Sequence, residues 1–400
     1  MPLGLDKRTL LKVTAASVSL APVLVRDALA QTLDPSEVER RLYAGPGLPG
    51  GGQMEVRMVV EVENPDSDIV EIARRLKPFN PQSWHDEHAR MAEKNESKAE
   101  KFASEGRKVT ASEYFLRASG FWRSAAIYLP ETDERMLPTY ERMRKTFDKV
   151  FTLVPAPFER VQIPYDGQTL EGLFYAARGG AGRKAPVVFN YSGADGMLGG
   201  RAGTGSGEFR ARGISYLDVD GPGQGGALRV KKIYAPPDSE RYAKAVVDYL
   251  VTRPDVDAER IAISGSSMAG YSAPRSASAE RRFKACAVTS GAYSLREDIF
   301  DYYPPIQDRL RWLIGAKDLA DARKKMAEFT LEGRAQKIEC PLLVGYSVDD
   351  RVMDPRGALK LHKAAVNTKS EMVEGTGHGK RVPEARAYVA DWFAKQLGTL

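Results

Sequence analysis

The sequence predicts an α/β protein in which a helical domain precedes a mostly parallel, doubly wound sheet. From about residue 69 to residue 154, apolar residues recur at the three- and four-residue spacing of helices that bury one face. From residue 158 the spacing becomes two, and short buried strands then alternate with helical segments. With 400 residues and a hydrophobic content of 42%, the chain has enough apolar surface for a sizeable core.

The first 65 residues have the composition of a targeting signal followed by a linker. Residues 1–30 look like an export signal, because Lys7 and Arg8 precede an apolar stretch and Ala28-Leu29-Ala30 supplies a small-x-small cleavage site. The charged start also resembles a twin-arginine signal in which lysine replaces the first arginine; an amphipathic amino-terminal helix is the alternative. We therefore expect a periplasmic or secreted protein, with residues 31–65 forming a linker or surface arm rich in glycine and proline.

Residues 66–155 are predicted to form a helical lid domain. The helical spacing is clearest between residues 108 and 129, where one face carries Tyr114, Ala118, Phe121, Ala125 and Tyr128. The flanking segments 83–103 and 132–151 have helical patterns as well.

Residues 156–400 are predicted to form the α/β catalytic domain. Asp166-Gly167 indicates a hairpin between two alternating strands, and Asp238 is expected to cap the helix that carries Tyr242. The buried strands are expected at 187–191, 214–219, 261–264, 285–289 and 342–346. The interval from about 295 to 335 is too long for a plain crossover, so we expect cap helices there that cover the site.

A sharp strand-to-helix turn is predicted between Ile263 and Tyr271. Such a turn strains its central residue and exposes its side chain, so the residues two before and two after must be small. Ser267 meets this requirement with Gly265 and Ala269, whereas Ser266 would place Met268 at the tight position and Ser264 lies within the strand. Ser267 is therefore the candidate nucleophile, and an ordinary turn of small residues is the alternative.

A serine nucleophile needs a base and a carboxylate that orients the base. Of the histidines, His378 alone lies in a glycine-flanked loop after a strand, whereas His85, His88 and His362 lie in helical segments. The acid is expected in the turn after the strand that follows Pro341. Asp350 is favoured over Asp349 by the length of that strand and turn; alternatively, one of the two caps the helix that starts near Pro355.

An oxyanion hole is also required, because the tetrahedral intermediate places charge on the former carbonyl oxygen. One donor is expected to be the backbone N–H of Met268, directly after the nucleophile. The second is expected in the glycine-containing loop after Tyr191, with Ala194 favoured and Gly193 as its neighbour.

The order Ser, Asp, His along the chain, together with three sequence segments, resembles the α/β-hydrolase superfamily. The segments are Arg253-Pro254-Asp255-Val256-Asp257 before the turn, the stretch from Asp218 to Gly225, and the stretch from Ala111 to Ala118. They resemble the FrsA-like group that includes 2,6-dihydroxypseudooxynicotine hydrolase, over roughly residues 80 to 397. The resemblance implies an α/β-hydrolase fold with a helical lid, triad positions at Ser267, Asp350 and His378, and cleavage of esters or of carbon-carbon bonds beside ketones. It also implies an acidic residue near the substrate, for which Glu297, Asp298 and Asp301 are the candidates.

The sequence thus predicts a serine hydrolase that attacks a carbonyl of a small, aromatic or ketone-bearing molecule, by hydrolysis of a carbon-carbon bond of the β-diketone type or of an ester. A carboxylesterase or lactonase for other substrates is the first alternative. A binding or regulatory protein on a hydrolase scaffold is the alternative of another class, because Ala269 stands where glycine is usual. A peptidase is less favoured, because no propeller-length region precedes the α/β domain.

No cofactor and no metal are expected, since His85 and His88 have helical spacing but no third ligand is apparent. The formal net charge of +6 is too small to indicate a nucleic-acid partner, and no membrane segment is visible after the signal. The sequence is compatible with a homodimer. Cys286 and Cys340 are expected to be buried thiols, with a disulfide left open.

Overall fold

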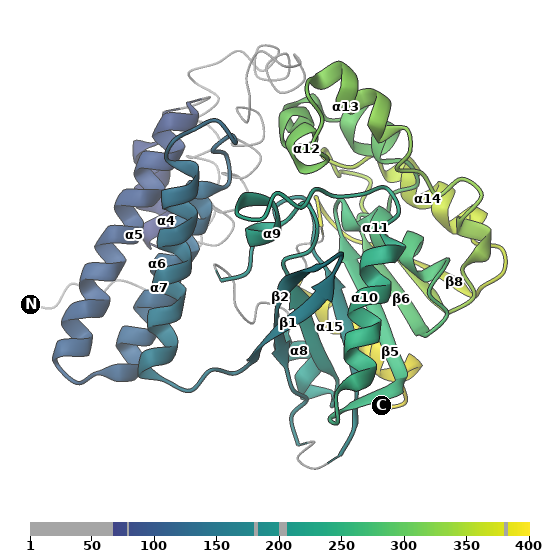
Figure 1. Cartoon of the computed structure of the whole chain (residues 1–400), viewed down its shortest axis with the longest axis horizontal. Helices are drawn as coiled ribbons and strands as arrows, with labels where there is room; N and C mark the ends of the chain where they lie inside the picture. The colour runs from purple at the N-terminus through teal and green to yellow at the C-terminus, as the bar shows by residue number, and fades with distance from the viewer. Residues whose placement is uncertain (1–66, 78–79, 180–182, 200–205, 380–382) are drawn as a thin grey trace, which may run out of the picture.

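The computed structural model describes residues 67–77, 80–179, 183–199, 206–379 and 383–400 (Figure 1). The predicted export signal and the linker over residues 31–65 lie outside these residues.

The helices before the first strand pack side by side as a bundle, which stands beside the sheet in Figure 1. The bundle comprises α4 (Ser67–Arg75), α5 (Pro81–Ser104), α6 (Lys108–Ala126) and α7 (Met136–Leu153). Helix α5 starts where its sequence indicates, because the Asn80 side chain accepts a hydrogen bond from the Ser83 N–H and Pro81 occupies the first turn. Apolar side chains from several of these helices, including Ile72, Met91, Phe121 and Met143, form one buried cluster.

An eight-stranded sheet follows the bundle, in the order β1-β2-β4-β3-β5-β6-β7-β8. The strands are β1 (Glu159–Tyr165), β2 (Gln168–Tyr175), β3 (Ala185–Tyr191), β4 (Ser215–Val219), β5 (Val256–Ser266), β6 (Phe283–Thr289), β7 (Leu342–Tyr346) and β8 (Ser370–Glu374). β2 pairs antiparallel with β1 and with β4, and every other pair is parallel. Asp166 and Gly167 both have positive φ in the β1–β2 turn, as a tight hairpin requires. The predicted mostly parallel, doubly wound sheet is confirmed.

Helices cover both faces of the sheet. One buried cluster joins the sheet to α10 (Glu240–Thr252), α11 (Ala269–Ala277) and α14 (Pro355–Ala364), and the other joins it to α8 (Ser206–Ala211) and α15 (Pro383–Gln396). The predicted Asp238 cap is wrong. Ser239 is the N-cap residue of α10, and its hydroxyl donates to the Ser272 carbonyl of α11 at 2.9 Å, which ties the two helices together.

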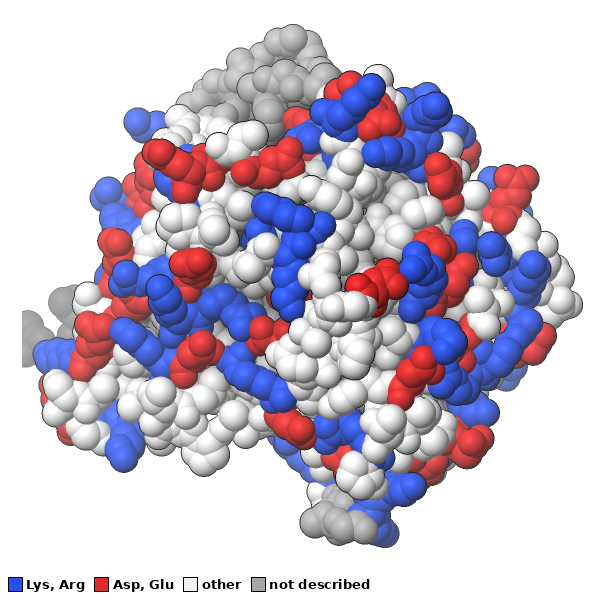
Figure 2. Space-filling model, in the orientation of Figure 1, with Lys and Arg blue, Asp and Glu red and all other residues white. Residues whose placement is uncertain are grey.

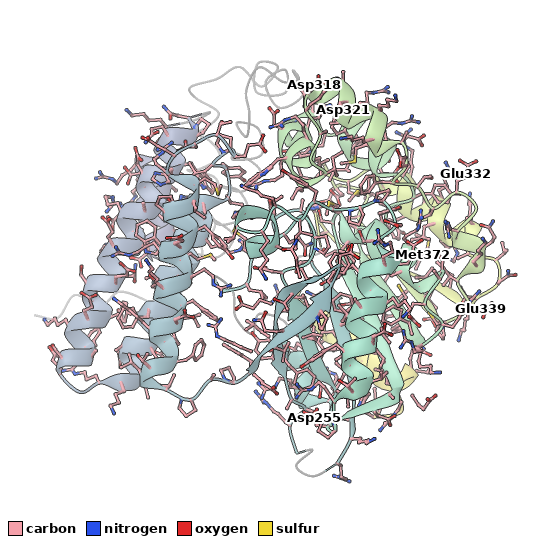
Figure 3. All side chains as sticks on the ribbon, in the orientation of Figure 1. Asp255, Asp318, Asp321, Glu332, Glu339 and Met372 are labelled. Atoms are coloured by element: carbon pink, nitrogen blue, oxygen red, sulfur yellow. The ribbon has the colours of Figure 1, made fainter. Side chains whose placement is uncertain are left out.

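Short helices fill the interval between β6 and β7, where cap helices were expected. They are η1 (Arg296–Asp301), η2 (Pro304–Ile306), α12 (Gln307–Leu313), α13 (Leu319–Met326) and η3 (Ala335–Lys337). Asp318 caps α13 by accepting a hydrogen bond from the Asp321 N–H at 2.7 Å, and Figure 3 shows both residues at the outer end of that helix. A further short helix, α9 (Gly225–Arg229), lies between the bundle and α12 (Figure 1).

Direct bonds join the bundle to the α/β domain. Arg144 of α7 bonds Glu171 of β2 at 2.7 Å, and Arg311 of α12 bonds Glu131, in the turn between α6 and α7, at 3.0 Å. Arg123 of α6 donates to the carbonyl oxygen of Asp195 at 2.7 Å. The bundle therefore reaches the loop that follows β3.

Basic and acidic side chains alternate over the face shown in Figure 2, in keeping with the small net charge. Within the described parts of the chain, no helix is both long enough and apolar enough to cross a bilayer.

Candidate active site

Ser267 lies at the turn between β5 and α11 with a φ of +59°, in the left-handed region that non-glycine residues rarely adopt. The turn is held from both sides, because the Ser267 N–H donates to the Thr289 carbonyl at 3.1 Å and the Gly270 N–H donates to the Ser267 carbonyl at 2.6 Å. The surrounding structure thus fixes a strained residue at the carboxyl end of a central strand.

The small residues around Ser267 are required by close backbone contacts. A Cβ atom at Gly265 would overlap the carbonyl of Ala269, and one at Gly270 would overlap the carbonyl of Ser290. Ser264, an alternative at the sequence level, lies within β5 and donates to Asn190 Oδ1 of the neighbouring strand β3 at 3.1 Å. The predicted sharp turn is therefore present, with Ser267 at its centre.

His378 contacts both other members of the predicted triad. Its Nε2 lies 2.9 Å from Ser267 Oγ, and its Nδ1 lies 3.0 Å from each carboxylate oxygen of Asp350. The loop that carries it turns at Gly377 and Gly379, both with positive φ. The remaining histidines bond elsewhere: His85 to Asp86, His88 to the Trp84 carbonyl and His362 to Ser370.

Asp350 and Asp349 have opposite environments. Asp350 is 2% exposed and accepts hydrogen bonds from the Val352 and Met353 N–H groups, both at 2.9 Å. Burial works to raise its pKa, but the hydrogen bond and charge of His378, together with those backbone donors, hold the pKa of Asp350 below its ordinary value. Asp349 is exposed and accepts only from the Gly377 N–H among the described residues. Neither residue caps α14, because Asp354 does so.

Ser290 is part of this hydrogen-bonded series, and sequence reasoning missed it. Its hydroxyl donates to Asp350 Oδ2 at 2.8 Å and accepts from the Gly379 N–H at 2.8 Å. Its φ of +53° places it in the same rare backbone region as Ser267. A signal was available, since Ser290 directly follows β6 and the carboxyl ends of parallel strands meet at one edge of a sheet.

The loop after β3 lies directly against Ser267. A Cβ atom at Gly193 would come within 2.9 Å of the Ser266 carbonyl oxygen and 3.2 Å of Ser267 Cβ. Gln224 holds this loop from the other side, because its amide donates to the carbonyl oxygens of Ser192 and, at 3.1 Å, of Gly193. Ala194 and Met268, the predicted oxyanion donors, are both buried, and Met268 is the N-cap residue of α11.

Comparison with known proteins agrees with this architecture. The model of the prolyl oligopeptidase family matches residues 240–399. The chain is 29% identical to hydrolase LUC6 of a Fusarium species over 71% of this chain and 78% of that protein, and 35% identical to the alpha/beta hydrolase psoB of Aspergillus fumigatus over 57% and 54%. The crystal structure of 2,6-dihydroxy-pseudo-oxynicotine hydrolase superposes with a TM-score of 0.70 at 24% identity, covering 83% of this chain and 93% of that one.

The chain has the α/β-hydrolase fold and is similar to named α/β-hydrolases. It is a hydrolase, because the relatives that it matches are named hydrolases. They do not support the alternative of a binding or regulatory protein on a hydrolase scaffold. The match to psoB spans about half the length of that relative.

The three candidate acids after β6 of this α/β-hydrolase have other partners. Asp301 pairs with Arg323 and Glu297 with Arg296, both near the surface. Asp298 is 7% exposed and accepts hydrogen bonds from the Tyr293 and Ser294 N–H groups at 2.6 and 2.9 Å. Burial raises the pKa of Asp298 to about 6, and the carboxylate serves to hold the chain between β6 and η1.

Cys286 and Cys340 are free thiols rather than a disulfide. Burial raises the pKa of both, to about 12 for Cys340, so neither is a reactive thiolate. In the parts of the chain that the structure describes, no three His, Cys, Asp or Glu side chains are grouped to hold a metal ion.

Two cavities of about 440 and 360 Å³ lie along the seam between α7 and the β1–β2 hairpin. Arg144, Asp148 and Glu171 line both, and neither is lined by Ser267, His378 or Asp350. They are separate from the chemistry described above.

Proposed function

We propose that this α/β-hydrolase is a serine hydrolase with Ser267 as nucleophile, His378 as general base and Asp350 as the orienting acid. The observation that carries the proposal is the continuous hydrogen-bonded series from Ser267 Oγ through His378 to Asp350 at the carboxyl end of β5. Ser267 Oγ attacks a substrate carbonyl while His378 Nε2 takes its proton, and Asp350 stabilises the imidazolium that forms. His378 then returns the proton to the leaving group.

The backbone N–H groups of Ala194 and Met268 are the proposed donors to the oxyanion. This assignment is supported by the close approach of the Gly193 loop to Ser267 and by the position of Met268 at the first turn of α11. Donors held by backbone geometry need no reorganisation when negative charge develops on the carbonyl oxygen.

The proposed substrate is a small, aromatic or ketone-bearing carbonyl compound, cleaved at a carbon-carbon bond beside a ketone or at an ester. Carbon-carbon cleavage requires His378 to protonate a carbon, which an enclosed site favours. We propose that the α4–α7 bundle and the helices between residues 295 and 335 enclose the site as a lid. Peptide hydrolysis is the competing function, because the prolyl oligopeptidase family matches residues 240–399.

A fluorophosphonate probe tests the nucleophile directly. We expect it to label the wild-type protein and not Ser267→Ala, with Ser266→Ala as the matched control that still labels. An unlabelled wild type, or equal labelling of Ser267→Ala, would exclude the mechanism.

A substrate panel then identifies the bond. Aryl esters, a β-diketone and a prolyl p-nitroanilide are incubated with wild type and Ser267→Ala, and the products are identified by mass spectrometry. We expect Ser267-dependent cleavage of the ester or the diketone; cleavage confined to the anilide would establish the peptidase instead.

We also propose that residues 1–30 direct export and are removed. Amino-terminal sequencing of periplasmic or secreted material should find a terminus near residue 31. An intact Met1 on exported protein would contradict this.

A further inference from the structure

Arg229 has a buried guanidinium group whose Nε has no hydrogen-bond partner among the described residues. The residue ends α9 and is 3% exposed. Burial, and then the charge of Arg309, lower the pKa of Arg229 to about 10, so the side chain remains cationic at neutral pH. Burying an unpaired charge is costly, and such groups are normally paired or bound to a ligand.

Aromatic rings hold this guanidinium in place. Its Cζ lies 5.6 Å from the ring centroid of Tyr140, in α7, and 5.1 Å from that of Trp312, in α12. Cation–π contacts offset part of the desolvation cost and fix the plane of the guanidinium, but they give its N–H groups no hydrogen-bond acceptor.

A second buried arginine stands beside it. The side chain of Arg309 is 8% exposed, its Cζ lies 5.3 Å from the Trp312 ring, and its Nε lies 4.0 Å from Asp195 Oδ1. Trp312 therefore contacts two guanidinium groups that repel one another. The nearby carboxylate of Asp220 is engaged by the N–H groups of Leu198 and Gly226, each at 2.8 Å, and is not paired with Arg229.

The two arginines adjoin the loop proposed to stabilise the oxyanion. Asp195, opposite Arg309, directly follows Ala194. The start of α9 is bound to the same loop, because the Gly225 N–H donates to the Gly196 carbonyl at 2.9 Å and Gln224 donates to the Gly193 carbonyl. The loop after β3 thus contacts Ser267 at Gly193 and joins α9 and α12 at Gly196 and Asp195, with Tyr140 contributed by the bundle.

We propose that Arg229 and Arg309 form a subsite for a carboxylate of the substrate, so that the preferred substrates are carbonyl compounds that also carry a carboxylate. The inference rests on the proposed serine hydrolase function and adds the substrate class. A planar guanidinium presents paired N–H donors that match the two oxygens of a carboxylate, and the aromatic walls strengthen the contact by excluding water. Binding would supply the acceptor that Arg229 lacks.

The test compares two esters that differ only at the far end of the acyl chain. 4-Nitrophenyl hexanoate ends in a methyl group, and mono-4-nitrophenyl adipate ends in a carboxylate. For wild type we expect a higher kcat/KM with the adipate ester. In Arg229→Gln the ratio of the two kcat/KM values, adipate over hexanoate, should fall about 30-fold, mainly through KM for the adipate ester.

Arg311→Gln is the matched control, because Arg311 lies on the same helix as Arg309 but pairs with Glu131. Its ratio should equal that of wild type. Arg309→Gln is measured in parallel and should lower the ratio, which keeps the test decisive if Arg229→Gln does not fold.

Fluorophosphonate labelling distinguishes a failure of the carboxylate subsite from a failure of the proposed serine hydrolase function. If Ser267 is labelled but wild type shows no preference for the adipate ester, or if the ratio is unchanged in both arginine variants, the carboxylate subsite is refuted while the nucleophile stands. If Ser267 is not labelled, the proposed function fails and the subsite fails with it.

Discussion

Two neighbouring carboxylates, Asp349 and Asp350, differ in every property that an orienting acid needs. Asp350 is buried, bonded to His378 and held by backbone donors, whereas Asp349 is exposed. We expect Asp350→Asn to lower kcat by about 10³- to 10⁴-fold, because the amide no longer stabilises the imidazolium or the required tautomer. Asp349→Asn, which keeps an oxygen for the Gly377 N–H, should stay within about threefold of wild type. Steady-state kinetics on one ester distinguish the two, and the reverse order would exchange their roles.

Ser290 is expected to act through Asp350 rather than on the substrate. Without the Ser290 hydroxyl, the buried Asp350 carboxylate loses one hydrogen-bond donor. The Gly379 N–H, which adjoins His378, loses its acceptor. Hydrogen bonds to charged groups contribute about 1.5–3 kcal/mol, so Ser290→Ala should lower kcat by about 10- to 100-fold with little change in KM.

Ser290→Gly shows whether a loss of activity comes from the missing hydroxyl or from backbone strain, because glycine adopts a φ of +53° without strain. If the hydroxyl positions Asp350, Ser290→Gly and Ser290→Ala should lose activity to the same extent. Full activity in either variant would remove Ser290 from the positioning of Asp350.

At the scale of the elements, the strand-to-helix turn depends on the contact between β5 and α11. A methyl group at Gly265 would overlap the backbone of Ala269, which cannot yield without moving α11. Gly265→Ala should therefore lower the free energy of unfolding by at least about 2 kcal/mol and abolish fluorophosphonate labelling. Gly207→Ala in α8 is the control, because no atom lies within 4 Å of the added Cβ, and it should be neutral or slightly stabilising. Urea denaturation measures both, and equal stability of the two variants would contradict the packing argument.

The sequence could predict what depends on local pattern and chain order. The alternating strands, the helical spacing around Phe121 and the order of Ser267, Asp350 and His378 all follow from short-range periodicity and turn chemistry, and the structure brings those three residues into contact. Ser290 and the Arg229–Arg309 pair could not be chosen in this way. Their roles depend on where separate loops and short helices meet. The position of Ser290 directly after β6 is one local signal, but nothing local distinguishes the two arginines from the others.

At the scale of the whole molecule, the bundle and the α/β domain are joined through side chains close to the proposed site. Arg123 bonds the carbonyl of Asp195, beside Ala194, and the Tyr140 hydroxyl lies 3.4 Å from Asp220. A displacement of the bundle would therefore act on the proposed oxyanion loop through these bonds. The same region also contains a partly buried acid, Asp218, whose titration affects the stability of the fold.

Asp218 lies on β4 within a chain of polar contacts across three strands. Asn190 of β3 donates to Asp218 at 2.7 Å and in turn accepts from Ser264 of β5. Burial raises the pKa of Asp218 to about 7, opposed by the Asn190 hydrogen bond and reinforced by the charge of Asp220. The folded protein therefore binds this proton more tightly than the unfolded chain, where the pKa of an aspartate is about 3.9.

The sign of the pH dependence follows from that difference. Between about pH 4 and pH 7 the folded state retains a proton that the unfolded state has lost, so the contribution of Asp218 to stability falls as the pH rises and levels off above pH 7. Asp218→Asn removes the titration while keeping an acceptor for Asn190. Its free energy of unfolding relative to wild type should rise through this window, by at most about 4 kcal/mol, as measured by urea denaturation at each pH. Asp391→Asn is the control of opposite sign: Arg212 holds the pKa of Asp391 below its ordinary value, so that variant should lose stability relative to wild type as the pH rises toward about 4, and its difference from wild type should stay nearly constant between about pH 4 and pH 7. A difference for Asp218→Asn that did not change with pH would show that Asp218 is ionised in the folded protein.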